Sequence, residues 1–385
     1  MKRGVSGFRG DRLSQALDVR RLSQVQLASM VEVSAPTISK WRSGQQNPDP
    51  EALERLARVI NVEPDWFLRP VLASEDNVLF RSNASAHVVA RALLRARHNW
   101  SKELVHGLCE FVDFPAVNFP TRSFAHPSEI ADEDIESAAA ECRNRWKLGL
   151  GPVSDVVLAI ENAGGIVVRE ITGVSQIEGL SSWCSTCARP FIYLCSDKGN
   201  GVRSRFDAAH ELGHIVLHRH VEPAAARAMH AEMERQAHRF AGAFLMPAET
   251  FAAEVPLTPS LDTLLALKPR WKVSVAAMMM RLSALELLDE KERLNLFKRK
   301  SSRFGSKAEP LDDRFEPEQP RLLRRAVTLL AESQTMPLEA IPRYFGLSKG
   351  DLEAIACLPA GYFSPKEGTV IDLESVRLRR ASGAA

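Results

Sequence analysis

The sequence lacks any apolar run approaching the roughly 20 residues that a membrane-spanning helix requires, although 45% of its 385 residues are hydrophobic. We expect no secretory signal in it, because the basic stretch of residues 1–11 has no apolar centre. A net charge of +2 excludes a chain that is strongly basic or acidic throughout. We therefore expect a soluble, cytoplasmic protein of two or three domains, without membrane contact.

Cysteine is scarce, with six residues in the whole chain, and this excludes a disulfide framework. Cys109, Cys142 and Cys357 stand among apolar residues and are expected in the core. Cys184 and Cys187 form a single C-x-x-C motif, which suits half of a zinc site or a redox pair. Because no second C-x-x-C completes a four-thiolate site, we expect a structural or incidental role for this pair.

The strongest chemical signal is an H-E-x-x-H motif at residues 210–214, within a stretch of helical apolar spacing. Residues four apart lie on the same face of a helix, so His210 and His214 point the same way. Two imidazoles placed like this can bind zinc, and Glu211 between them is positioned to accept a proton from an activated water. The pattern favours a zinc hydrolase over an amphipathic helix that carries two histidines by accident.

A catalytic zinc usually has three protein ligands, and the sequence offers several candidates for the third. His220 fits the third-histidine position of the metzincin pattern, but Leu217 replaces the glycine that lets that chain turn. Glu234 lies on the next predicted helix, among small residues that permit close packing. We favour Glu234 as the third ligand, with Glu232 as a weaker choice and His238 as a residue that could orient a ligand. Surface positions are then expected for His218, His220 and His230.

Residues 9–68 predict a bundle of short helices. Ser23 is placed to cap a helix over residues 24–31, and Ser34 to cap a second helix over residues 35–43. Two helices joined by such a tight turn form a helix-turn-helix arrangement. Before residue 45 the chain carries eight basic side chains against three acidic ones, which suits contact with phosphates.

The stretches Leu22-Ser-Gln-Val-Gln-Leu-Ala and Val33-Ser-Ala-Pro-Thr-Ile-Ser-Lys-Trp-Arg-Ser-Gly resemble the phage-repressor (Cro/C1, or XRE) family. The resemblance implies a double-stranded DNA operator as partner, and such domains usually bind as dimers, so a homodimer is one expected state. Arg42 departs from the acidic residue common in the family and is expected to add a phosphate contact. A protein-interaction bundle that has lost DNA binding is the alternative. By the resemblance, the side chains facing DNA are Gln24, Ser34, Ala35, Thr37 and Lys40.

The predicted fold class is α+β and mostly helical. Three strand-like runs, residues 166–171, 177–183 and 190–195, predict a small antiparallel sheet that leads into the H-E-x-x-H helix. Phe191–Cys195 is our candidate for an edge strand that pairs with a substrate peptide. The expected parts are a helix-turn-helix domain at 1–70, a helical connector at 71–149, a zincin-like domain at 150–300, a linker at 301–320 and a helical C-terminal module at 321–385. Solvent-facing positions are expected for Arg97 and Lys102 in the connector, and the linker is expected to be solvated.

The segment from Arg203 to His218, followed by Glu234-Arg-Gln-Ala-His-Arg-Phe-Ala-Gly-Ala-Phe-Leu-Met-Pro, resembles the ImmA/IrrE family of zinc metallopeptidases. The resemblance covers about residues 150–290. It implies that His210, His214 and Glu234 bind Zn²⁺ and that Glu211 is the catalytic base. The family cleaves helix-turn-helix repressors, which switches on genes for stress response or mobile elements. Many relatives carry asparagine where this chain has His238.

Two functions follow from these features. The first is a DNA-binding transcriptional regulator with a zinc endopeptidase domain, which cleaves a repressor-type protein, itself or a partner, under inducing conditions. The second is a DNA-binding repressor or antitoxin-like regulator whose metal domain acts as a sensor and cuts nothing. The retained Glu211 favours the first, because a metal sensor needs no base at that position.

Overall fold

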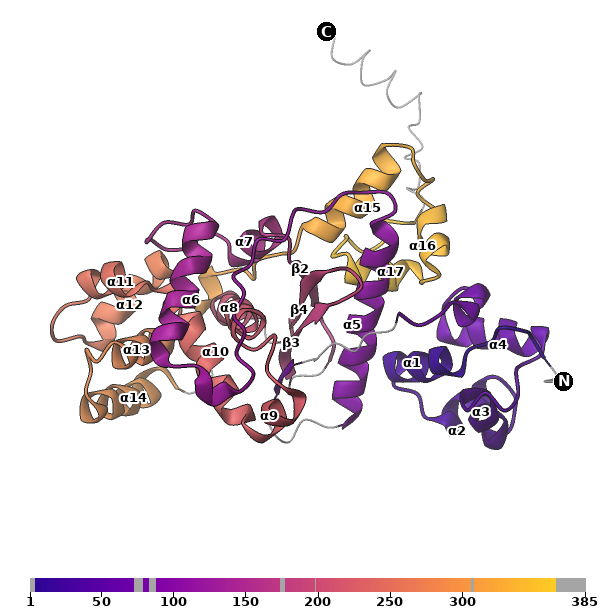
Figure 1. Ribbon diagram of the computed structural model, residues 1–385, viewed down its shortest axis with the longest axis horizontal. Helices are drawn as coiled ribbons and strands as arrows, with labels where there is room; N and C mark the ends of the chain where they lie inside the picture. Colours follow the sequence, from indigo (N-terminus) through magenta and orange to yellow (C-terminus); the bar gives the residue numbers. More distant parts are fainter. Residues whose placement is uncertain are drawn as a thin grey trace, which may run out of the picture.

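The computed structural model describes residues 4–72, 79–82, 88–173, 177–197, 199–305 and 308–364, with residues 79–82 described by their backbone. A small sheet stands in the middle of the molecule (Figure 1). The N-terminal helices lie at one end, beyond the long helix α5 (Val88–Leu108), and a group of helices lies at the other end. No helix among the described residues is both long and apolar enough to cross a membrane.

The N-terminal domain forms as its sequence predicts. Its helices are α1 (Gly10–Arg20), α2 (Gln24–Met30), α3 (Ala35–Arg42) and α4 (Pro50–Ile60). Ser23 caps α2 in a reciprocal capping box with Gln26, and Ser34 caps α3 by accepting from the Thr37 amide. Leu27 and Ile38 are fully buried between the helices. The tight α2–turn–α3 unit is therefore held by its caps and by a small apolar core.

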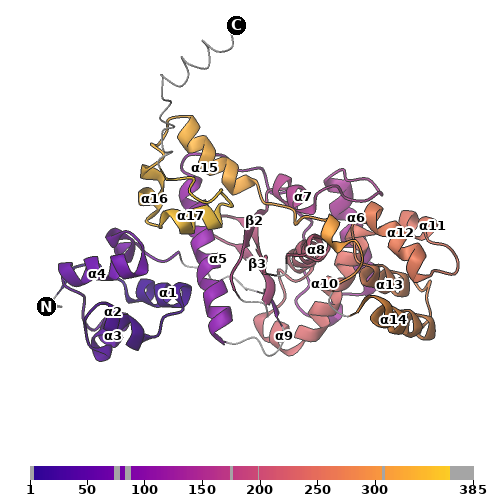
Figure 2. The same cartoon turned by 180° about the vertical axis from the view of Figure 1, so that it is seen from behind.

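Helix α5 joins the N-terminal domain to the rest of the protein. It contacts α1 on one side and strand β3 (Ile177–Cys184) on the other (Figures 1 and 2). Arg12 of α1 donates to Glu103 of α5 over 2.6 and 2.8 Å and is buried. The prediction that Arg97 and Lys102 face solvent was wrong: both are buried, because α5 is covered on two sides.

The sheet has the order β1-β3-β4-β2, with β1 (Leu79–Ser82), β2 (Ile166–Glu170) and β4 (Arg189–Cys195). The predicted antiparallel sheet is corrected to a mixed one, since β2 pairs with β4 in parallel while β1, β3 and β4 pair antiparallel. Strands β2 and β4 are buried on both faces, because α5 and the C-terminal helices cover one face and the H-E-x-x-H helix covers the other. Strands that are buried on both faces appear in the sequence as continuous apolar runs. Such runs do not reveal the order or the direction in which the strands pair.

The position of β4 also corrects the predicted substrate strand. Phe191–Cys195 lies inside the sheet, with β3 on one side and β2 on the other. Both rows of its backbone groups are therefore paired within the sheet. This strand cannot pair with a substrate peptide, and the edges of the described sheet are β1 and β2.

The H-E-x-x-H motif lies in α8 (Gly201–Leu217), which packs against β3, β4 and α10 (His230–Leu245). A Cβ atom on Gly213 would lie 3.1 Å from the Phe240 side chain, so the glycine permits the close approach of α8 and α10. Helix α6 (Asp132–Arg145), from the predicted connector, packs on the other side of α10. The remaining helices around this core are α7 (Val156–Asn162), α9 (Pro223–Ala228), α11 (Ala248–Glu254), α12 (Leu261–Trp271), α13 (Val275–Ala284) and α14 (Glu290–Phe304).

In the segment predicted as a solvated linker, residues 301–320, the described residues 301–305 and 308–320 are tied to the fold. Helix α14 continues to Phe304. Glu309 accepts from the buried Lys268 ammonium over 3.2 Å and from the Val275 amide over 2.7 Å. Glu318 accepts from the Val156 amide over 2.8 Å at the start of α7. The acidic residues of this segment therefore cap two helices, which a count of charges does not reveal.

The C-terminal module consists of α15 (Leu322–Glu332), α16 (Ala340–Phe345) and α17 (Lys349–Ile355). It lies beside α5 and β2 (Figure 2). A backbone bridge joins Val62 to Leu347, so the module also contacts the end of the N-terminal domain. Its contacts are therefore with both neighbouring parts of the same chain.

The cysteines differ in part from expectation. Cys142 is buried as predicted, whereas Cys109 is exposed and Cys357 is half-buried. Cys184 ends β3, and its thiol accepts from the amide of Cys187 over 3.4 Å in the turn that leads to β4. The C-x-x-C motif therefore shapes a hairpin turn in this structure.

Candidate metal centre

Three side chains from two helices converge beside the sheet. His210 and His214 of α8 point their Nε2 atoms toward each other at 3.1 Å. Glu234 of α10 places Oε2 at 3.4 Å from the His210 Nε2 and Oε1 at 3.2 Å from the His214 Nε2. Within the described part of the chain these three form the one group of His, Cys, Asp or Glu whose ligand atoms could hold a metal ion.

The separations of these atoms fit a tetrahedral zinc site. Zinc bonds of about 2.0–2.2 Å at tetrahedral angles place two ligand atoms about 3.3–3.6 Å apart. The separations here are 3.4 Å, inside this range, and 3.1 and 3.2 Å, just below it, with a different Glu234 oxygen nearest to each histidine. Two imidazoles with one carboxylate is also a donor set used by catalytic zinc sites. The residues therefore fit the metal that the sequence predicts.

A hydrogen-bonded chain behind His214 fixes which of its nitrogens faces the site. The Gln236 amide nitrogen donates to the Pro127 carbonyl over 2.8 Å, so its oxygen faces His218. That oxygen accepts from the His218 Nε2 over 2.9 Å, which leaves the His218 Nδ1 to accept from the His214 Nδ1 over 2.9 Å. His214 consequently presents an unprotonated Nε2 toward Glu234, as a metal ligand must.

The prediction that His218 lies on the surface was wrong. The side chain is fully buried, and burial together with the nearby His214 lowers its pKa to about 3. His218 therefore stays neutral and can pass on the hydrogen bond from His214. The signal was present in the sequence, because residues 210, 214 and 218 repeat every four positions along one helix face.

Glu234 is ionised in this setting. Burial alone would raise the pKa of its carboxyl, but the adjacent His210 and His214 hold the pKa well below its ordinary value. A carboxylate beside two imidazoles provides the negative charge that suits a divalent cation.

Glu211 is fully buried between α8 and the sheet. A Cβ atom on Gly179 of β3 would lie 3.0 Å from the Glu211 Oε1 and 3.3 Å from its Cγ. Glycine at this position therefore leaves room for the carboxylate. Helix α8, which carries His210, Glu211 and His214, lies beside strand β3 (Figure 1).

Comparison with known protein families agrees with both halves of the molecule. Residues 13–67 match the family described as helix-turn-helix, and residues 161–283 match the family described as IrrE N-terminal-like domain. The chain joins an XRE-type helix-turn-helix domain to an ImmA/IrrE-like domain. A comparison with curated proteins finds no match.

The two other candidates for the third ligand, His220 and Glu232, do not join the cluster. His220 is exposed beyond the end of α8. Glu232 pairs with Arg235 over 2.8 Å instead. His238 is exposed, with its ring centroid 4.5 Å from that of His210, and its Nδ1 donates to the Glu234 carbonyl over 2.8 Å. The geometry therefore favours Glu234 as the third ligand of the set.

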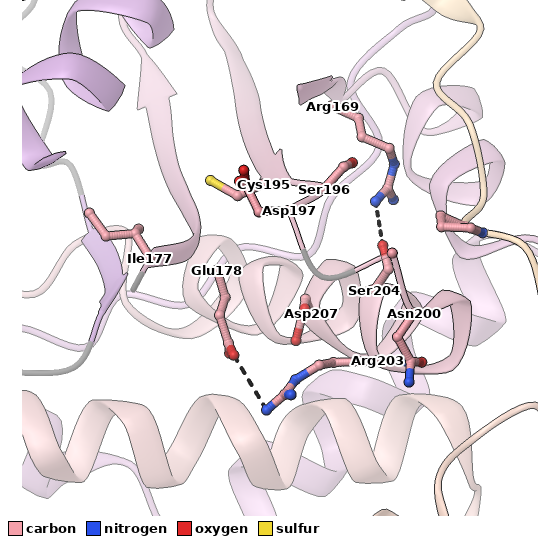
Figure 3. Close-up of a pocket in the computed structure, with 12 residues that line it drawn as sticks. Arg169, Ile177, Glu178, Cys195, Ser196, Asp197, Asn200, Arg203, Ser204 and Asp207 are labelled. Atoms are coloured by element: carbon pink, nitrogen blue, oxygen red, sulfur yellow. Dashed lines mark hydrogen bonds and ion pairs between the residues drawn. The ribbon is translucent and has the colours of Figure 1, made fainter. Parts of the chain in front are cut away.

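Two hollows of different size flank helix α8 of the ImmA/IrrE-like domain. A cavity of about 930 Å³ opens beside Phe206 and His238 and extends to α13 and α14. The pocket in Figure 3 holds only about 20 Å³, and an ion pair of 3.4 Å between Glu178 and Arg203 closes one side of it. Because about 10–15 Å³ accommodates a single water, only the larger cavity could receive part of a peptide.

The helix-turn-helix domain presents the predicted DNA-facing residues on α2 and α3. None of them is buried, and Lys40 and Ser34 are exposed. The Arg42 guanidinium donates to the Ser14 hydroxyl over 3.1 Å, so it lies against α1 here. The candidate set with surface access is Gln24, Ser34, Ala35, Thr37, Lys40 and Arg42.

Proposed function

We propose that this protein is a DNA-binding transcriptional regulator whose ImmA/IrrE-like domain is a zinc-dependent endopeptidase. The observation that carries the proposal is the convergence of His210, His214 and Glu234 beside the buried carboxylate of Glu211. Three ligands and a base form the set that metal-assisted peptide hydrolysis requires.

Glu211 is the general base of the proposed reaction. A zinc ion bound at the site would polarise the peptide carbonyl and make a water molecule easier to deprotonate. Glu211 accepts that proton and then delivers it to the leaving amine. Transfer of this kind contributes about 10²–10⁴-fold to the rate. The chain through His218 and Gln236 holds His214 in the tautomer that binds metal.

The proposed substrate is a helix-turn-helix repressor, either this chain or a partner, cleaved in response to stress or to a mobile-element signal. Support comes from the helix-turn-helix domain in the same chain, which would bring the peptidase to operator DNA, there as a homodimer. The resemblance to the ImmA/IrrE family points to the same class of substrate.

A second candidate function is favoured by one observation. Strand β1 lies along the outer side of β3, the strand that contacts Glu211, where a substrate peptide would be expected. This favours a regulator whose metal domain senses a signal and cuts nothing, because such a domain does not need a free strand edge to bind a substrate.

The test compares the zinc-loaded wild-type chain with Glu211→Gln, each incubated with purified helix-turn-helix repressors and with itself under inducing conditions. We expect defined fragments from the wild type only, with the cleavage rate of Glu211→Gln lower by about 10²–10⁴-fold. Equal zinc content and equal binding to selected operator DNA serve as controls. If both proteins pass the controls and neither cleaves anything, the sensor function replaces the peptidase.

A further inference from the structure

The outer side of β3 is covered by β1, which follows the helix-turn-helix domain and precedes α5. The two strands are antiparallel, with Leu79 opposite Ser181 and Phe80 opposite Leu180. Arg81 is opposite Gly179. The pairing then slips by one residue, so that Ser82 is opposite Ile177.

The register places β1 beside the proposed base. Gly179 is the residue of β3 against which the Glu211 carboxylate packs, at 3.0 Å from an added Cβ atom. Neighbouring strands lie about 4.8 Å apart. The backbone of Arg81 is therefore one strand spacing from the residue that contacts Glu211.

A peptide that pairs with a strand is held extended, and this can place one of its carbonyls at a fixed metal and base. Strand β4 is interior, and β2 lies two strands away from β3 and packs against α17. Of the described strands, β3 contacts Glu211 through Gly179, so a peptide along the outer side of β3 would lie beside the base. That place is taken by β1.

We infer that β1 occupies, in the same chain, the strand position of a peptide substrate, so that residues 79–82 keep the peptidase site closed to other peptides. The inference rests on the proposed function. Any other substrate must first displace β1. The strand has four residues and an irregular pairing at Arg81 and Ser82, so few backbone hydrogen bonds must be exchanged when a competing strand replaces it.

The test uses the full-length, zinc-loaded chain carrying Phe80→Pro and Arg81→Pro together. Successive N–H groups of a strand point to opposite sides, so one of two consecutive prolines removes a donor that faces β3. The matched control carries Phe80→Ala and Arg81→Ala, which keep both donors. Operator binding and the circular dichroism spectrum show that both variants are folded.

Two measurements are made on both variants and on the wild type. The first is cleavage of a quenched fluorescent peptide library, for which we expect a rise of about tenfold in the proline variant, because a larger fraction of the sites is open. The second is hydrogen exchange of the amides at residues 179–181, which should be faster in the proline variant. A synthetic peptide of residues 77–84 should restore the protection and inhibit the cleavage competitively.

The two measurements separate this inference from the proposed function. If no variant cleaves, while the prolines expose residues 179–181 and the peptide protects them again, the peptidase proposal fails and the strand assignment stands. If the chain cleaves the library but the proline and alanine variants show equal rates and equal exchange, the peptidase stands and the inference is overturned.

Discussion

Two buried polar clusters lie on opposite faces of the sheet and differ in how their charges are balanced. In the metal-site cluster, His210, His214 and Glu234 bring three electron-pair donors to one point. In the ion-pair cluster, the Arg97 guanidinium contacts Glu170 over 2.6 and 2.9 Å and Asp351 over 2.6 Å.

The ion-pair cluster has its cations built in. Arg20, at the end of α1, donates to Asp351 over 3.0 Å, and the Tyr193 hydroxyl donates to Glu170. The guanidinium carbons of Arg20 and Arg97 lie 5.5 and 5.6 Å from the Trp100 ring centroid. Two guanidinium groups thus contact two carboxylates, and the four side chains come from the helix-turn-helix domain, α5, β2 and α17.

The contrast separates a binding site from a structural joint. The metal-site cluster consists of electron-pair donors, so it is completed by a cation from solution. Its side chains come from one short stretch of the chain. A cluster with matched charges requires no ligand and can connect distant segments. Three predictions test this contrast, and a fourth concerns a buried carboxyl outside both clusters.

Removing a ligand of the metal-site cluster should abolish zinc binding. Glu234→Ala leaves two imidazoles and no anionic donor, so we expect the dialysed protein to lose its zinc, as measured by mass spectrometry of the metal. His220→Ala is the matched control and should retain one zinc per chain. The opposite pattern would move the third ligand to His220.

Removing the central cation of the ion-pair cluster should destabilise the fold without changing zinc content. Arg97→Met leaves the Glu170 carboxylate buried without its guanidinium partner and removes one of the two guanidinium groups beside Asp351, which costs about 3–5 kcal/mol. The measurement is urea unfolding. The control is Arg303→Met, which breaks the exposed 2.7 Å pair with Asp262 and should cost about 0–1 kcal/mol. If both variants lost the same free energy of unfolding, the ion-pair cluster would not be what connects these segments.

Removing the support of His214 should weaken the metal site without emptying it. His218→Leu keeps the pocket filled but breaks the chain to Gln236. We expect zinc affinity to fall by about 10–100-fold, the usual effect of losing a partner of a metal ligand. Competition with a zinc chelator measures it. His220→Leu, at an exposed position, should leave affinity unchanged.

Glu161 is a buried carboxyl that belongs to neither cluster. It accepts from the Arg321 and Leu322 amides at the start of α15, and burial raises its pKa to about 7. The folded chain then holds a proton that the unfolded chain releases above its ordinary pKa of 4.5. Its contribution to stability is complete below pH 4.5 and is lost as the pH rises to about 7, by at most about 1.4 kcal/mol per pH unit. Glu161→Gln has no titrating group at this position, so its free energy of unfolding should not fall by this amount between pH 4.5 and 7. The measurement is the free energy of unfolding of both proteins as a function of pH. If the two plots were parallel, the raised pKa of Glu161 would be contradicted.

The sequence predicted those parts of the protein that depend on short-range patterns. Caps at Ser23 and Ser34 and the spacing of His210 and His214 are local, so the helix-turn-helix domain and the H-E-x-x-H helix could be located. Sheet order depends on pairing between strands far apart in sequence, and strands buried on both faces show no alternation. The interior position of β4 and the outer strand β1 were therefore missed.

Buried charges were missed for a related reason. An arginine in a predicted helix is assigned to the solvent-facing side unless its partner is known. The partners of Arg97 lie 73 and 254 residues away in the sequence, so they could not be identified from it. His218 was different, because its spacing from His214 was visible and only its role was not recognised. Glu309 and Glu318 likewise cap the ends of helices that lie far from them in the sequence, so their role could not be predicted from the sequence.

The docking of the helix-turn-helix domain on α5 bears on what a cut in this chain would achieve. The salt bridge between Arg12 and Glu103 and the pair of Arg20 with Asp351 hold the domain independently of the chain between residues 72 and 88. A cut there would leave two pieces in contact and turn an intramolecular association into a bimolecular one. Separation would then depend on protein concentration, so the same cut would release the DNA-binding piece in a dilute solution and keep it attached in a concentrated one.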